Sequence, residues 1–150
     1  MNIKAQQLSK RFEELRPLST TNRPARGWIR AVRETLGMTM RQLAKRLGVK
    51  QPTLAELEKG EATGNITVKS LERAAEAMGC RLVYALVPTK PLTETIKERA
   101  SQLAKQKLAA VEQTMRLENQ QVHGQASRKE AERRLVEELL RRPARLWDEP

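Results

Sequence analysis

Residue types that perform catalysis are too few and too scattered in this 150-residue chain to build an active site. The chain has one histidine, one cysteine and one aspartate, which are His123, Cys80 and Asp148. They lie in separate segments, so the chain does not offer a nucleophile paired with a base, nor a complete set of metal ligands. A single cysteine also excludes an internal disulfide and fits a reducing compartment. We therefore predict a protein that is not an enzyme and that uses no cofactor and no metal.

The charge of the chain points to the binding of a polyanion. Lysine and arginine outnumber aspartate and glutamate by 29 to 18. Twelve of these basic residues fall within residues 1–50, against three glutamates, whereas the rest of the chain is nearly balanced. Concentrated positive charge attracts phosphate backbones, so we expect a nucleic-acid surface in the N-terminal part. Because no apolar run is long enough for a membrane span and the amphipathic first residues differ from a secretory signal, we expect a cytoplasmic protein.

Hydrophobic spacing predicts a mainly α fold. Helices are expected over residues 3–15, 28–37, 40–47 and 51–59, then from residue 68, from 91 to about 122, and in a last stretch before the C-terminal tail. The linker RPLSTTNRPARG after the first helix is a candidate basic arm. The fold class is therefore a compact helical module followed by a C-terminal helical extension.

Local signals mark where the central helices begin and end. Thr39 is followed three positions later by Gln42, which is the pattern of a capping box at a helix start. Gly48 can make the tight turn after that helix, and Gly60 is expected to end the next one. Thr67 is placed to cap the helix that follows.

In residues 80–88, CRLVYALVP, the helical spacing of apolar residues stops, and β-branched and aromatic residues predict one short strand. A lone strand leaves its backbone N–H and C=O groups without partners, and no second convincing strand is found in the chain. We therefore expect residues 81–87 to pair antiparallel with their copy in a second protomer, in a homodimer interface that buries Leu82, Tyr84 and Leu86. The alternative is a strand that packs on its own helices without pairing.

The run RQLAKRLGVKQPTLAELEKGE at residues 41–61 resembles the phage-repressor-like helix-turn-helix family, also called XRE or Cro/C1-type. Gln42, Gly48, Gln51 and Glu58 are among the matching positions, and residues 25–79 cover the domain. In that family the third helix enters the major groove of double-stranded DNA with its first residues nearest the bases. The sequence departs from the family at Lys50, where a Ser or Thr usually caps this helix.

The resemblance implies a DNA-binding surface built from the second and third helices of the module. Gln51 suits adenine, Thr53 suits a phosphate or a thymine methyl group, and Glu56 can accept a hydrogen bond from cytosine. Gln42 is expected to contact the DNA backbone together with its helix N-terminus, and Arg41 and Arg46 to add charge. The implied DNA-binding residues are Arg41, Gln42, Arg46, Lys50, Gln51, Pro52, Thr53 and Glu56.

A closer resemblance extends over about residues 23–88, through RPARGWIRAVRETLGMTMRQLAKRLGV and ERAAEAMGCRLVYALVP, to the family called mobile mystery protein A. Members are typically encoded beside a protein with a Fic domain, which transfers AMP from ATP onto protein hydroxyls. The resemblance thus implies an antitoxin paired with a Fic toxin. Inhibitors of Fic enzymes carry a helical motif of Ser or Thr, three residues, Glu, then Gly or Asn.

That inhibitory motif occurs once in the chain, on the predicted long helix. It is formed by Thr114, Glu118 and Asn119. Thr114 and Glu118, four positions apart, share one helix face. By the resemblance, Glu118 would pair with the arginine that otherwise holds the γ-phosphate of ATP in the toxin. The alternative is an ordinary exposed polar helix face.

The sequence as a whole predicts a dimeric antitoxin that represses its own operon. Its module binds the promoter, and its C-terminal helices inhibit a Fic toxin. One rival is a plain XRE-type repressor whose C-terminal helices only extend the dimer, and another is an adaptor that has lost affinity for DNA. The expected parts are an N-terminal helix and arm at 1–24, the DNA-binding domain at 25–79, the dimerisation strand at 80–88 and the inhibitory extension at 91–150.

Overall fold

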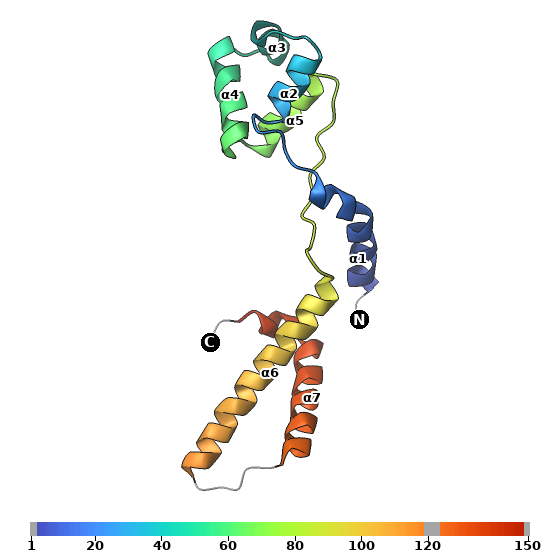
Figure 1. Ribbon diagram of the computed structural model, residues 1–150, viewed down its shortest axis with the longest axis vertical. Coiled ribbons are helices and arrows are strands. Elements are labelled where there is room, and N and C mark those ends of the chain that lie inside the picture. Colours follow the sequence, from blue (N-terminus) through green and yellow to red (C-terminus); the bar gives the residue numbers. More distant parts are fainter. Residues whose placement is uncertain (1–2, 119–123, 149–150) are drawn as a thin grey trace. The chain divides into compact units, whose positions relative to one another are not determined.

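The computed structural model describes residues 3–118 and 124–148 (Figure 1). All regular secondary structure in these ranges is helical. The order of elements is α1 (Ile3–Leu15), the 3₁₀ helix η1 (Arg16–Thr20), α2 (Trp28–Thr35), α3 (Met40–Leu47), α4 (Gln51–Thr63), α5 (Val68–Ala77), α6 (Leu92–Leu117), α7 (Gln125–Arg141) and the 3₁₀ helix η2 (Pro143–Leu146). The prediction of a mainly α fold with C-terminal helices is confirmed.

The chain divides into two compact units. Residues 15–87 form one unit, which contains helices α2 to α5, and we call it the N-terminal module. The described parts of residues 1–14 and 88–150 form the other unit, which contains α6, α7 and η2.

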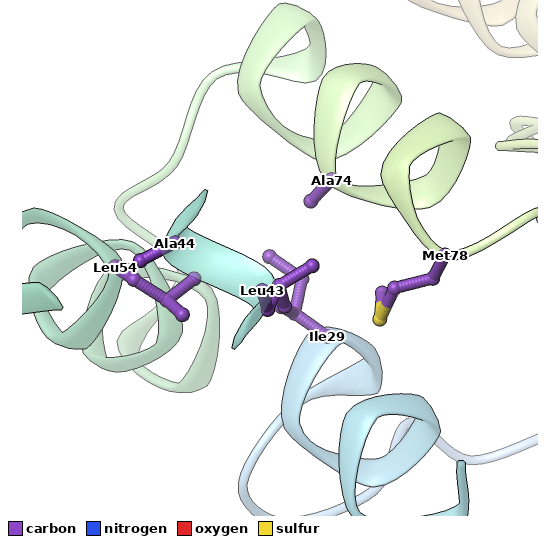
Figure 2. Packing of buried hydrophobic residues seen from close by; sticks show 6 residues of the cluster. All are labelled: Ile29, Leu43, Ala44, Leu54, Ala74 and Met78. Carbon is purple, nitrogen blue, oxygen red and sulfur yellow. The ribbon is translucent and has the colours of Figure 1, made fainter. Parts of the chain in front are cut away.

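Four helices of the N-terminal module share one hydrophobic core (Figure 2). The buried side chains come from α2, α3, α4 and the end of α5, and they are Ile29, Leu43, Ala44, Leu54, Ala74 and Met78. Leu43 and Leu54 have no exposed surface, so the central side chains of α3 and α4 are both fixed within this core. Close packing of this kind leaves the two helices few alternative orientations.

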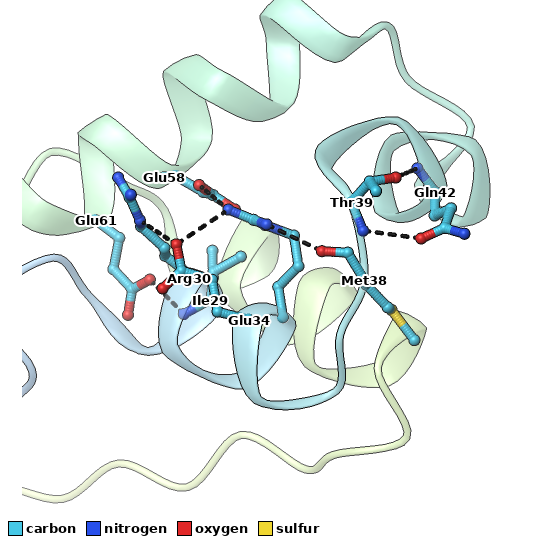
Figure 3. Close-up of polar contacts among 9 residues, drawn as sticks. Ile29, Arg30, Glu34, Met38, Thr39, Gln42, Glu58 and Glu61 are labelled. Atoms are coloured by element: carbon cyan, nitrogen blue, oxygen red, sulfur yellow. Dashed lines mark hydrogen bonds and ion pairs between the residues drawn. The ribbon is translucent and has the colours of Figure 1, made fainter.

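The ends of α3 and the start of α4 form as their residues predict. The Thr39 side-chain oxygen accepts from the Gln42 backbone N–H at 3.2 Å, and the Gln42 side-chain oxygen accepts from the Thr39 N–H at 2.8 Å, which completes the capping box (Figure 3). Gly48 ends α3 at φ 68°, a left-handed conformation that glycine adopts without strain. No side chain caps α4, as expected from Lys50 at that position.

The prediction that Gly60 ends the third helix of the module is wrong. Helix α4 continues to Thr63 and ends at Gly64, which has φ 80°. Gly60 is needed for a different reason, because a Cβ atom there would lie 2.5 Å from the Asn65 carbonyl oxygen. The glycine therefore allows the chain after α4 to return close to the helix, where the Asn65 N–H donates to the Gly60 carbonyl.

A buried ion pair joins α2 to α4 within the module. Arg33 donates from Nε to Glu58 Oε1 at 2.6 Å and from Nη2 to Oε2 at 3.2 Å, and both residues are less than 8% exposed. Its third nitrogen donates to the Met38 carbonyl oxygen at 3.0 Å, in the segment before α3 (Figure 3). The hydrogen bonds that Arg33 donates to Glu58 raise the pKa of its guanidinium. One side chain thus joins α2, α4 and the segment before α3.

The C-terminal unit is built on close contact between α6 and α7. Its buried residues are Ala100, Ala104, Leu139 and Leu146. The two alanines lie one turn apart on α6, and their small side chains allow the leucines of α7 and η2 to approach the helix. Arg99 donates from Nε to the Leu146 carbonyl oxygen at 2.8 Å, which anchors η2 against α6.

Residues 80–88 form no helix and no strand within the single chain. Past Cys80, whose N–H donates to the Ala75 carbonyl, no backbone hydrogen bond of residues 81–88 is made to the described part of the chain. The side chains of Val83, Tyr84 and Leu86 are 68%, 74% and 90% exposed. The strand and its pairing across a dimer therefore stay predictions, since an intermolecular strand exists only when the second copy is present.

We predict that Glu58→Gln destabilises the N-terminal module by about 3 to 5 kcal/mol, because it leaves the buried Arg33 charge without its counter-ion. Folded domains have only about 5 to 15 kcal/mol of stability, so the loss is a large share of the total. The measurement is urea denaturation followed by circular dichroism. The matched control is Glu34→Gln, which removes an exposed carboxylate and is expected to leave the transition nearly unchanged. Equal transitions for the two variants would contradict the prediction.

Candidate nucleic-acid interface

The first two turns of α4 present a group of polar side chains to solvent. Gln51, Pro52, Thr53 and Glu56 are exposed, as is Lys50 just before the helix. Leu54 between them is fully buried in the core. The predicted base-reading residues therefore share the outer side of a helix whose inner side is fixed.

The start of α3 supplies a second exposed group. Arg41 and Gln42 are both exposed in the first turn of this helix. The capping box uses the side-chain oxygen of Gln42, so its amide nitrogen is available as a donor beside the helix N-terminus. A helix N-terminus with exposed donors is a favourable place for a phosphate.

Arg46 has a structural contact that the sequence analysis did not foresee. Its Nη1 donates to the Ala77 carbonyl oxygen at 3.2 Å, at the end of α5. Arg73 makes the reciprocal type of contact, with its Nη2 donating to the Leu47 carbonyl oxygen at the end of α3. These two arginines satisfy carbonyl groups that a helix end leaves without intrahelical partners. Arg46 is thus partly engaged within the module, while Arg41 and Lys50 have no ion pair to any described residue.

A buried carboxylate near the end of α4 caps another helix. Glu61 is 2% exposed, and it accepts from the Trp28 N–H at 2.7 Å and from the Ile29 N–H at 2.9 Å. These are the first N–H groups of α2, and the negative charge also favours this end of the helix dipole. Gly27 permits the contact, because a Cβ there would lie 2.7 Å from a Glu61 oxygen.

The candidate basic arm is partly held by the module. Arg23 donates from Nη1 to the Glu61 carbonyl oxygen at 2.9 Å and from Nη2 to the Ala62 carbonyl oxygen at 3.3 Å. It therefore anchors the linker to the last turns of α4. Glu58 could be suspected from its spacing, because it lies four positions after the buried Leu54 on the same face, but no spacing indicates the partners of Arg23 and Glu61.

The predicted inhibitory residues lie at the end of α6. Thr114 is in the last turn, where its hydroxyl donates to the Ala110 carbonyl at 3.1 Å. Glu118 is exposed and follows the last helical residue, with its N–H donating to the Thr114 carbonyl at 3.2 Å. Asn119, together with His123, lies outside the described residues.

Within residues 3–118 and 124–148, none of the helices is both long enough and apolar enough to cross a membrane. No group of three His, Cys, Asp or Glu side chains in these ranges is placed to hold a metal ion.

Comparison with known proteins gives one match. Residues 29–84 match the family model described as helix-turn-helix, and the match spans α2 to α5 and the first part of the segment after α5. No curated protein and no solved structure matches the chain. The matched family is one of DNA-binding domains rather than of enzymes. Residues 29–84 therefore form a helix-turn-helix domain of the XRE type, and this match supports a DNA-binding regulator.

Proposed function

We propose that this protein is a dimeric repressor of its own operon and the antitoxin of a Fic-type toxin, with DNA bound by α3 and α4 and the toxin inhibited by the end of α6. The observation that carries the DNA-binding part is the exposed polar group at the start of α4, held on a helix whose opposite side is fully buried. A helix presented in this way fits the major groove of B-DNA, which is about 12 Å wide.

In this proposal each exposed residue of α4 has a task set by its chemistry. Gln51 donates to and accepts from adenine N6 and N7, and Glu56 accepts from cytosine N4. Thr53 contacts a phosphate or a thymine methyl group. Lys50 and Arg41 bind phosphates together with the Gln42 amide at the start of α3, which sets the orientation of the domain on the duplex.

The extended segment after α5 supports a homodimer. Its exposed side chain Tyr84 lines an open groove of about 430 Å³ whose walls also include Trp28, Ile66 and Met78, and Leu86 further along is 90% exposed. Pairing two copies of residues 81–87 satisfies their backbone groups and covers these apolar side chains. A twofold dimer also presents two copies of α4, as an operator with two half-sites requires.

The antitoxin part of the proposal depends on the resemblance to the mobile mystery protein A family and on the motif at Thr114 and Glu118. The exposure of Glu118 at the end of α6 is compatible with insertion into a partner's active site. A carboxylate binds an arginine through charge-assisted, geometrically demanding hydrogen bonds, so it competes with the γ-phosphate of ATP. The rival function is a plain repressor whose helices α6 and α7 have no toxin partner.

For DNA reading, we predict that Gln51→Ala weakens binding to the operator by about 1 to 3 kcal/mol, because one bidentate base contact is lost. Binding to random duplex is expected to change little. The measurement is fluorescence anisotropy on both duplexes, with Gln106→Ala on α6 as the matched control. Equal losses on operator and random DNA would contradict a role for Gln51 in base reading.

For the dimer, we predict that the wild-type protein sediments as a dimer at micromolar concentration and that Leu86→Asp sediments as a monomer. The charge would be buried in the strand interface without a partner. Leu36→Asp is the matched control, because it places the same charge on another exposed leucine of the N-terminal module that lies outside residues 81–87. A monomeric wild-type protein in sedimentation equilibrium would overturn the dimer.

For the antitoxin, we predict that a Fic protein is encoded beside this gene and that Glu118→Gly releases its AMP transfer, while operator binding stays unchanged. Glu94→Gly, in the first turn of α6, is the control that removes a carboxylate elsewhere on the same helix. Adenylylation is measured with labelled ATP after co-purification of the pair. Full inhibition by the Glu118→Gly protein, or the absence of a complex with the neighbouring Fic protein, would contradict the antitoxin role and favour the plain repressor.

A further inference from the structure

An open groove of about 500 Å³ lies in the N-terminal module between α2, the first residue of α3 and one face of α4. Arg26, Arg30 and Lys59 line it, together with Met40 and Ala55. None of these five residues belongs to the group assigned above to reading bases or binding DNA.

The groove carries an excess of positive charge. Its four cations face one carboxylate, that of Glu58, which is already used by the buried Arg33. Arg30 binds Glu34 at 2.7 Å, and this hydrogen bond lowers the pKa of the Glu34 carboxyl. Arg26 and Lys59 make no ion pair and no side-chain hydrogen bond to any described residue. These two exposed cations thus lie at the edge of one groove without a direct ion pair or side-chain hydrogen bond, although Arg26 also helps to lower the pKa of Glu34 from a distance.

The groove adjoins the proposed DNA surface on both sides. Met40, which lines it, is the first residue of α3 and stands two residues before Gln42. Ala55, which also lines it, directly precedes the base-reading Glu56 on α4. Lys59 lies one turn further along α4, on the same face as Ala55. A DNA strand that passes the start of α3 would next meet these cations.

We propose that this groove seats phosphates of the operator backbone, with Arg26 and Lys59 as their ligands. The proposal rests on the DNA-binding function proposed above, and it extends the interface from the two motif helices to the segment before α2 and the second half of α4. Contacts of this type carry no sequence information, but they add affinity and fix the orientation of the domain. Each phosphate contact also releases a bound counter-ion, so it raises the salt dependence of binding.

The test is a salt series on the full-length protein. Binding to an operator duplex from the protein's own promoter and to a scrambled duplex is measured by fluorescence anisotropy for Arg26→Gln, Lys59→Gln and the double variant. Each lost contact is expected to reduce the slope of log K against log salt by about 0.9, which corresponds to roughly eightfold weaker binding at about 0.1 M salt. The ratio between operator and scrambled affinities is expected to stay unchanged. Lys59→Arg keeps the charge and is expected to keep the slope.

Lys97→Gln on α6 is the matched control, because it removes an exposed lysine from the other unit. Circular dichroism of each variant verifies the fold. Slopes equal to that of the wild type, with the wild type still discriminating the operator, would overturn the groove and leave the DNA-binding function standing. Reduced slopes on both duplexes without discrimination by the wild type would support the groove and overturn specific repression. No binding of the wild type to either duplex would overturn both.

Discussion

The orientation of α4 depends on two buried carboxylates that lie three residues apart on that helix. Glu58 binds Arg33 on α2, and Glu61 accepts from the first N–H groups of the same helix. Both are less than 8% exposed, and the described part of the chain has no buried side-chain polar atom without a hydrogen-bond partner. Burial of a carboxylate is costly unless its oxygens are satisfied, so these contacts allow few other arrangements of α2 and α4. A helix that reads DNA needs such a fixed support, because each base contact depends on the direction of its side chain.

The basic residues of the N-terminal module serve two different purposes. Arg23, Arg33 and Arg46 bind carbonyl or carboxylate groups of the module itself, and their charges stabilise helix ends or the buried pair. The side chains of Arg26, Arg41 and Lys59 make no hydrogen bond to the described residues of the module. The strong positive charge of this half of the sequence is therefore only in part a measure of its phosphate-binding surface. The part that remains exposed lies where the proposed DNA contacts are.

The two units separate the proposed functions along the chain. The helix-turn-helix domain has its own core, and the C-terminal helices have another, built on two alanines of α6 and the leucines of α7 and η2. Because neither core borrows a residue from the other, a substitution at Glu118 is not expected to disturb α4. This independence would allow single substitutions to separate the proposed antitoxin motif from the proposed DNA-reading helix.

The sequence by itself determined the features whose partners are close along the chain. Thr39 and Gln42 are three residues apart, Thr67 caps the helix beside it, and Gly48 makes a turn that needs only its own left-handed backbone. Such local hydrogen bonds and turn preferences act over a few residues, so their patterns are visible in the amino-acid order. The exposed start of α4 followed from the same local reasoning, because the apolar positions define the inner face of the helix.

Only the tertiary structure decided which distant groups meet. Gly60 has the signature of a helix end, but it lies inside α4, where the close approach of the Asn65 carbonyl leaves no room for a Cβ atom. Arg23 and Glu61 find partners more than thirty residues away, and no local pattern selects them among the many charged residues of the chain. Whether residues 81–87 become a strand depends on a second copy of the chain. The physical reason is the same in each case: these contacts are chosen by burial and packing in three dimensions, which residue spacing alone does not encode.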